Sequence, residues 1–277
     1  MRFVQRQPDD SVNLPKSHPL RNAAELVLGV GALVLVASLL VTYFVDIAVA
    51  VIPYEAEAEF SSRLFRDSTM GLGAPGDQSS ALEQLTARLS SGWPDNPYSF
   101  RVRIADMPKP NAFALPGGLI VVTQGLLDAC ESENELAFVL AHEIAHYRNR
   151  DQLRGMGSAL LLQMALSMVG AAGDISPLSS PMQLAQLGSS REREEAADRF
   201  GLSLVAAHYG HINGSWAFFE HLTDEGDATP AFFSTHPGSA GRAQALRRIA
   251  AQNGWSTTGT LRPWPMEQRA AGDGVVD

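Results

Sequence analysis

The chain has 277 residues, a formal net charge of −9 and a sequence pI near 5.2. Such an acidic chain lacks the basic surface that nucleic acid requires, so we expect no nucleic-acid partner. Its one cysteine, Cys130, excludes an internal disulfide and a metal site built on several cysteines.

The first predicted element is an apolar helix that can cross a membrane. Residues 26–45 contain no charged side chain, and about 20 apolar residues span the hydrocarbon core. Basic residues precede this segment and acidic residues follow it, which places residues 1–25 in the cytoplasm. For a bacterium, this predicts a single-pass protein of the inner membrane with its main part in the periplasm. A cleavable signal peptide, ending near residues 48–50, is the alternative and gives the same compartment.

A small sheet is expected in the next part of the chain. Residues 54–95 are predicted as a helical lead-in, with a Gly-, Pro- and Ser-rich mobile loop at 71–80. Residues 99–105 alternate between apolar and charged side chains, which is typical of a strand. Residues 119–123 are apolar and β-branched and follow a Pro-Gly-Gly turn, which indicates a second strand.

The most informative motif is His-Glu-Ile-Ala-His at residues 142–146. His142 and His146 are four residues apart, so on a helix they share one face and can bind one tetrahedral zinc ion. Glu143 between them can take a proton from a water on that ion. The alternative is that both histidines are hydrogen-bonded to carbonyl groups in the core.

The residues around this motif predict a buried helix. Ser132 and Glu135 have the spacing of a capping box at its start. Apolar and small residues follow at helical spacing, so most of the helix should be buried. Two buried imidazoles without partners are costly, and a metal ion would supply the partner.

Two histidines leave a zinc ion without a third protein ligand, and a later helix can supply it. Glu194 and Asp198 are four residues apart and share a helix face with small and apolar residues. Glu194 can complete a site of two histidines and one glutamate, with water in the fourth position. Asp198 can accept the free N–H of a ligating histidine. Ser189 and Glu192 are expected to cap this helix.

The apolar stretch at 155–173 lies between the two parts of the predicted site. Ligands of one zinc ion cannot lie on opposite sides of a membrane, so a single crossing here is excluded. The segment that follows is short and contains two prolines, which disfavours a return span. We therefore expect a core helix or a helix that lies against the membrane.

Four segments, in the same order, resemble the HtpX-like zinc metallopeptidases, which are relatives of the CAAX prenyl endopeptidase and of mitochondrial Oma-type stress proteases. They are residues 111–127, the histidine motif, the helix with Glu194 and Asp198, and Ser-Thr-His-Pro at 234–237. The resemblance implies a mostly helical α+β fold with a small sheet. A gluzincin-like metallopeptidase domain at 96–254 would follow one transmembrane helix.

The resemblance also implies the role of each site residue. His142, His146 and Glu194 would bind one Zn²⁺ ion per subunit, and Glu143 would be the general base. Asp198 would accept a hydrogen bond from the free N–H of a ligating histidine and would not bind the ion itself.

Three further residues would act on the substrate in this resemblance. Asn111 and Ala112 would bind an extended peptide, which could add as one more strand to the edge of the sheet. His236 would hydrogen-bond the carbonyl oxygen that becomes the oxyanion. The alternative for His236 is a loop residue that orders the turn around it.

Taken together, the sequence predicts a membrane-anchored zinc metalloendopeptidase that cleaves extended or misfolded proteins in envelope quality control. Its partners would be polypeptides and, through residues 26–45, the lipid bilayer; the sequence does not indicate an oligomeric state. One alternative is the same enzyme with its active site in the cytoplasm. Another is a non-catalytic, zinc-containing binding protein of the chaperone type. Residues 255–277 are expected to form a weakly ordered tail.

Overall fold

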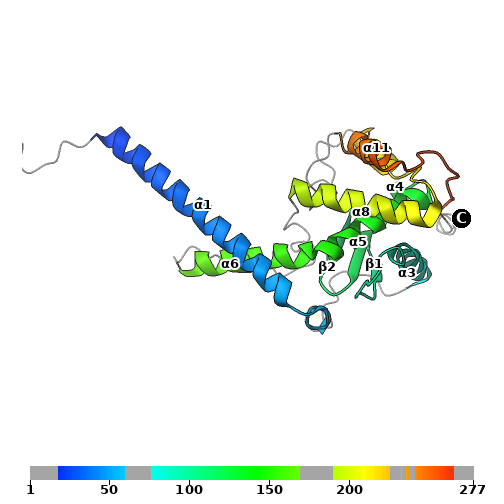
Figure 1. The fold of residues 1–277 in the computed structure, drawn as a ribbon, viewed down its shortest axis with the longest axis horizontal. Coiled ribbons are helices and arrows are strands. Elements are labelled where there is room, and N and C mark those ends of the chain that lie inside the picture. The colour runs from blue at the N-terminus through cyan, green and yellow to red at the C-terminus, as the bar shows by residue number, and fades with distance from the viewer. Residues whose placement is uncertain are drawn as a thin grey trace, which may run out of the picture.

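The computed structural model describes residues 18–59, 76–168, 190–224, 232, 235–236 and 241–264. Within these ranges the protein is mostly helical, with one small sheet and one apolar helix that projects from the remainder (Figure 1). This is the mostly helical α+β fold that the sequence predicts. The elements are α1 (Pro19–Val51), α3 (Asp77–Ser90), β1 (Arg101–Ala105), β2 (Ala112–Leu115), β3 (Leu119–Thr123), α4 (Gln124–Ala129), α5 (Glu133–Asn149), α6 (Asp151–Met168), α8 (Arg191–Tyr209), α9 (Ala217–Asp224) and α11 (Arg242–Asn253).

The sheet has its strands in the order β1-β3-β2, with β1 parallel and β2 antiparallel to the central β3. The turn between β2 and β3 requires Gly118, because its φ of +85° is left-handed and a Cβ there would lie 2.8 Å from the carbonyl oxygen of Ser99. The Tyr147 hydroxyl lies 2.6 and 2.7 Å from the carbonyl oxygens of Leu115 and Leu119. These two contacts attach the hairpin formed by β2 and β3, and with it the edge strand β2, to α5.

Helix α5 runs through the centre of the protein, and every residue from 134 to 147 is buried. The predicted capping box is confirmed: Ser132 Oγ accepts a hydrogen bond from the Glu135 amide and donates one to Glu135 Oε1. The helix ends at Arg150, whose φ of +54° is left-handed. The chain therefore turns at once into α6.

Helix α8 packs closely along α5 because a glycine lies at the contact. A Cβ on Gly201 would lie 3.1 Å from the amide nitrogen of His142. The capping box predicted from Ser189 and Glu192 is wrong by one residue. Ser190 caps the helix instead, because its hydroxyl accepts a hydrogen bond from the Arg193 amide in the first turn.

The sheet has a hydrophobic cluster on each face. Ile120 and Val122 of β3 belong to the main core, whereas Leu119 and Val121 belong to a smaller cluster. Side chains of α1 and α6 complete the smaller cluster: Val45, Val49, Leu153 and Met156. The C-terminal end of α1 is therefore an integral part of the fold.

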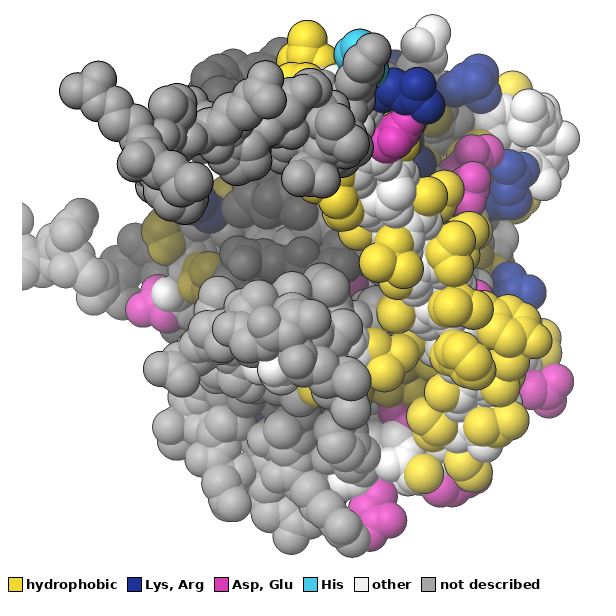
Figure 2. All heavy atoms as spheres, turned by 90° about the vertical axis from the view of Figure 1, so that its left-hand side faces the viewer, with side chains coloured by type: hydrophobic (Ala, Val, Ile, Leu, Met, Phe, Trp, Pro, Cys, Tyr) yellow, Lys and Arg dark blue, Asp and Glu magenta, His cyan; other side chains and the backbone are white. Residues whose placement is uncertain are grey.

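The remainder of α1 is exposed and apolar. By length and composition it is the one helix among the described residues that could cross a membrane, and it contains the predicted segment 26–45. Hydrophobic side chains gather into one broad area on the face in Figure 2, the face from which α1 projects. Exposed apolar side chains gathered in this way are typical of a surface that contacts a membrane or another protein.

Two segments differ from the predicted loop and tail. Residues 77–80 form the first turn of α3, because the helix begins at Asp77; residues 71–75 lie outside the described residues. In the predicted tail, the Arg262 carbonyl accepts a hydrogen bond from the Glu133 amide at 2.9 Å, and Pro263 forms a β-bridge with Ser132. Residues 262 and 263 thus bond to the start of α5, while residues 265–277 lie outside the described residues.

Candidate metal centre

Helix α5 presents two imidazoles on one buried face. His142 and His146 are one turn apart, and their Nε2 atoms lie 3.1 Å from each other. Two ring nitrogens at this distance are arranged to share one proton or one metal ion. The motif is therefore located in the core, and neither ring belongs to a solvated helix face.

Helix α8 brings a carboxylate to these nitrogens. Glu194 Oε2 lies 3.2 Å from His142 Nε2, and Glu194 Oε1 lies 3.6 Å from His146 Nε2. The contact depends on the close packing at Gly201, since Glu194 is two helical turns before that glycine. Glu192 and Glu195, which flank Glu194 on the same helix, are exposed.

A third histidine joins the group from a distant part of the chain. His236 Nδ1 lies 3.2 Å from Glu194 Oε2 and 3.3 Å from His142 Nε2. The donor atoms of His142, His146, Glu194 and His236 all lie within 4.8 Å of one another. The sequence placed His236 near the oxyanion, whereas this geometry also makes it a possible fourth ligand.

Each histidine of α5 has a carboxylate on its other ring nitrogen. Asp198 Oδ1 lies 3.0 Å from His142 Nδ1, and Asp151 Oδ2 lies 2.9 Å from His146 Nδ1. Such carboxylates fix the tautomer and orientation of a ligating imidazole. The sequence pointed to Asp198 but not to Asp151, which stands outside the histidine motif at the start of the next helix.

Arg242 is a further member of the site that the sequence reasoning missed. Its guanidinium donates to both oxygens of Asp198, at 2.9 Å from Nε and 2.6 Å from Nη2, and lies 3.3 Å from Glu194 Oε2. The sequence feature that could have identified it is its position, because Arg242 shares the apolar face of α11 with Leu246 and Ile249. A charged residue at a buried helix position requires a partner of opposite charge.

The buried charges of this centre fit a divalent cation. Four carboxylates are almost fully buried around one buried guanidinium, that of Arg242; they belong to Glu143, Asp151, Glu194 and Asp198. An excess of buried negative charge is costly unless a cation compensates it. Imidazole and carboxylate donors together are the ligands that zinc and similar metals accept.

The pKa values of the residues in this centre agree with this requirement. Burial and the charge of Arg242 disfavour the protonated form of His142, but hydrogen bonds to Asp198 and Glu194 outweigh them and raise its pKa to about 9. Burial also disfavours the ionised form of Glu194, yet the charge of His236 and the hydrogen bonds from His142 and His236 hold its pKa well below the usual range. The centre therefore favours positive charge beside an ionised carboxylate.

Glu143 faces this group of donors without a hydrogen bond of its own. It is fully buried, and neither of its oxygens has a hydrogen-bond partner among the described residues. It makes an ion-pair contact of 3.4 Å, from Oε1 to His236 Nε2. A buried carboxylate that makes no hydrogen bond can accept a proton from a molecule that enters the site.

The two residues predicted to bind peptide lie beside His236. Ala112 begins β2, and its carbonyl oxygen lies 3.4 Å from His236 Nε2. The amide and carbonyl groups of Asn111 are already bonded to Thr123, and its side-chain oxygen accepts a bond from Thr235. Ala112 and the residues after it in β2, rather than Asn111, therefore have the backbone groups that a peptide could use.

Comparison with known proteins connects this site to one family. The model of peptidase family M48 matches residues 78–250. Mitochondrial metalloendopeptidase OMA1 of Schizosaccharomyces pombe is 35% identical over 145 residues, which cover 50% of this chain and 43% of that protein. A Vibrio cholerae protein named as a beta-barrel assembly-enhancing protease is 33% identical over 159 residues, covering 51% of this chain and 33% of that protein.

Metalloprotease YcaL of Escherichia coli is 28% identical over 178 residues, which cover 61% of this chain and 69% of that protein. The chain thus spans less than half the length of the OMA1 and Vibrio relatives. The family match nevertheless contains every residue of the metal centre, from His142 to Arg242. This chain belongs to peptidase family M48.

Proposed function

We propose that this M48 metallopeptidase is a zinc-dependent endopeptidase, held at a membrane by α1. The observation that carries the proposal is a buried carboxylate without hydrogen bonds, that of Glu143, beside four groups that could hold a metal ion. A structural metal site would need no such carboxylate. His142, His146 and Glu194 would hold the ion.

Zinc, when bound there, would supply positive charge that polarises a peptide carbonyl and acidifies water. Glu143 would accept the proton of the attacking water and later deliver it to the amine of the leaving group. Asp151 and Asp198 would keep the two imidazoles in the required tautomer. Arg242 would hold Asp198 in its ionised form.

His236 would stabilise the oxyanion through Nε2, which lies toward Glu143 and the Ala112 carbonyl. The ring is held by stacking on Phe232, with centroids 4.4 Å apart. We expect His236→Ala to keep bound zinc and to lower kcat about 10²-fold or more. A rise in kcat would instead mean that the ring occupies the position that a reacting water needs.

The substrate would be an extended polypeptide segment. β2 is an edge strand, and no described strand pairs with its outer side. A peptide that adds to this edge would be held by main-chain bonds, which suits unfolded or extended segments of varied sequence. This mode of binding supports a role in protein quality control.

The compartment follows from the charges around α1. The basic residues before residue 26 favour a cytoplasmic N-terminus, and hence a periplasmic catalytic domain at a bacterial inner membrane. Alkaline phosphatase fused to the C-terminus should be active in cells. An inactive phosphatase fusion, with an active cytoplasmic reporter at the same position, would support the alternative of a cytoplasmic active site.

The decisive experiment measures zinc content and casein cleavage for the full chain and its Glu143→Gln variant. We expect equal zinc, and a loss of about 10²- to 10⁴-fold in turnover for the variant. Glu195→Gln is the matched control, since this glutamate is exposed on α8 and pairs with Arg199. Near-normal turnover in Glu143→Gln would contradict the mechanism, and equal zinc without activity in any form would favour a binding protein.

A further inference from the structure

Helix α6 leaves the metal centre and runs back beside α1. Asp46 of α1 forms an ion pair with Arg154 of α6 at 2.8 Å. One turn further along α6, a Cβ on Gly157 would lie 3.2 Å from the Val45 side chain. From the first of these contacts to the second, the residue number rises in α6 and falls in α1. The two helices therefore run in opposite directions where they cross (Figure 1).

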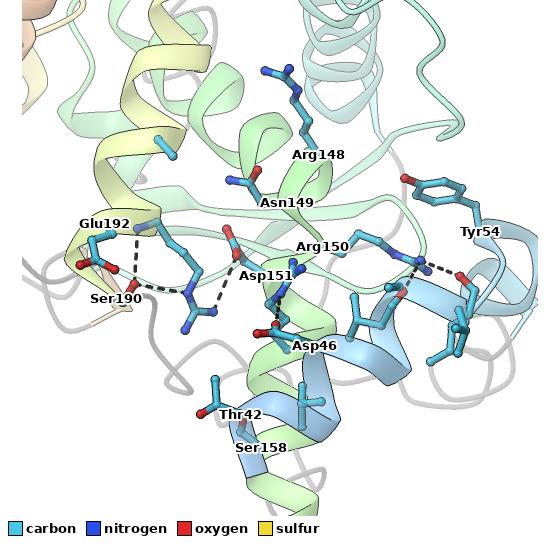
Figure 3. Close-up of a pocket in the computed structure, with 18 of the residues that line it drawn as sticks. Thr42, Asp46, Tyr54, Arg148, Asn149, Arg150, Asp151, Ser158, Ser190 and Glu192 are labelled. Atoms are coloured by element: carbon cyan, nitrogen blue, oxygen red, sulfur yellow. Dashed lines mark hydrogen bonds and ion pairs between the residues drawn. The ribbon is translucent and has the colours of Figure 1, made fainter. Parts of the chain in front are cut away.

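Polar groups gather where these two helices meet the rest of the protein. Arg150 donates hydrogen bonds to the carbonyl oxygens of Val49 and Ile52, at 2.8 and 2.6 Å, and thereby satisfies the end of α1. Figure 3 shows this junction, with charged and hydroxyl side chains around a cavity of about 1050 Å³. The junction has the polarity expected at the headgroup level of a bilayer, just beyond the apolar segment of α1.

Beyond Arg154, α6 is apolar like its neighbour. Residues 155–168 contain no charged side chain. Leu161 and Val41 pack against the same hydrophobic cluster as Val45. Val41 lies inside the charge-free segment of α1, about 6 Å along the helix axis from Val45. Leu161 is therefore level with the last turn of the proposed span.

We propose that α6 is a second membrane-contacting element, which enters the leaflet around the C-terminal end of α1 without crossing the bilayer. The proposal rests on the proposed anchoring by α1. Lipid acyl chains are the fitting occupant, because the outer side of α6 continues the apolar surface of α1 and Leu160 on it is 37% exposed. Within its described residues, α6 does not meet the length and hydropathy of a membrane span.

This arrangement fixes the height of the metal centre above the membrane. Asp151, the first residue of α6, bonds to the ligand candidate His146. Asp151 and Arg154 are one helical turn apart on α6, so the contact between Asp151 and His146 ties the metal centre to the polar boundary at Arg154. Two membrane contacts, rather than one, would also prevent the domain from rotating about α1.

The test uses the full chain reconstituted in vesicles, with one added cysteine that carries an environment-sensitive fluorophore. The positions are Leu160 on α6, Leu33 in the span and Leu261, an exposed leucine near the opposite end of α5. The native Cys130 is buried and is kept. Zinc content verifies that each labelled protein is folded, and lipids brominated on their acyl chains act as quenchers.

We expect acyl-brominated lipids to quench the labels at Leu160→Cys and Leu33→Cys and to leave Leu261→Cys bright. Quenching at Leu33→Cys alone would overturn the proposal for α6 and leave the anchoring by α1 intact. Quenching at neither position would contradict the anchoring itself. If Leu160→Cys does not fold, Ser167→Cys, which is also exposed on α6, takes its place.

Discussion

Glu194 and Glu195 are neighbours on α8, yet their surroundings differ completely. Glu194 is buried against His142 and His146, whereas Glu195 is exposed and pairs with Arg199 at 3.1 Å. We expect Glu194→Ala to lose bound zinc, because two histidines and a water hold the ion weakly. Glu195→Ala should keep it. Zinc content measured after dialysis distinguishes the two, and full occupancy in Glu194→Ala would remove Glu194 from the ligand set.

Asp151 should matter for metal affinity although its carboxylate is not among the four donor groups that lie within 4.8 Å of one another. Its carboxylate orients His146 and adds negative charge behind the ring. We expect Asp151→Asn to weaken zinc binding about 10- to 100-fold, measured by competition with a chelator. Asp106→Asn, at an exposed position, is the control. Equal affinities in the two variants would mean that His146 needs no partner.

Between elements, the contact of α5 with α8 decides whether the site forms. A Cβ on Gly201 would crowd the backbone at His142, with a closest distance of 3.1 Å. Overpacking costs about 1–3 kcal/mol, and alanine regains up to about 1 kcal/mol of helix propensity. We expect Gly201→Ala to lower the free energy of unfolding by about 1 kcal/mol, and to weaken zinc binding, because α8 moves away with Glu194.

Denaturant unfolding and chelator competition on the same Gly201→Ala protein measure both effects. A variant that is more stable than the original, with unchanged zinc affinity, would show that α8 can shift without moving Glu194. Unfolding data for the metal-free protein are needed as well, since bound zinc stabilises any form that retains the site.

The starts of α5 and α8 show how well a helix cap can be predicted from the local sequence. Ser132 was identified as a cap because its hydroxyl and Glu135 have the reciprocal spacing of a capping box. The same pattern at Ser189 gave the wrong residue, because the neighbouring Ser190 also has a hydroxyl and it is this hydroxyl that accepts the bond from the Arg193 amide. The end of the chain was expected to be loose, whereas the free backbone groups at the start of α5 bind residues 262 and 263.

For the molecule as a whole, bound metal should contribute to stability. The centre buries four carboxylates around one buried guanidinium, that of Arg242, and among the described residues the half-exposed Arg193 is the only other arginine that pairs with them, at Asp151, so removal of a cation leaves uncompensated negative charge. We expect a chelator to lower the Tm and added zinc to restore it, with a gain of about 4 kcal/mol when free zinc is about a thousand times its Kd. Glu143→Gln should respond in the same way. A Tm that is insensitive to chelator in the original protein would argue against a resident metal ion.

The sequence alone determined the features that depend on spacing within one element. Helical periodicity places His142 beside His146 and Glu194 beside Asp198, and the charge-free length of residues 26–45 gives one apolar helix. Only the tertiary structure decided which helix faces meet. The close approach at Gly201, the approach of His236 through Nδ1, and the partners Asp151 and Arg242 depend on packing between elements. Periodicity shows which residues share a face, but the distances between faces are set by the volumes of the side chains that pack between them.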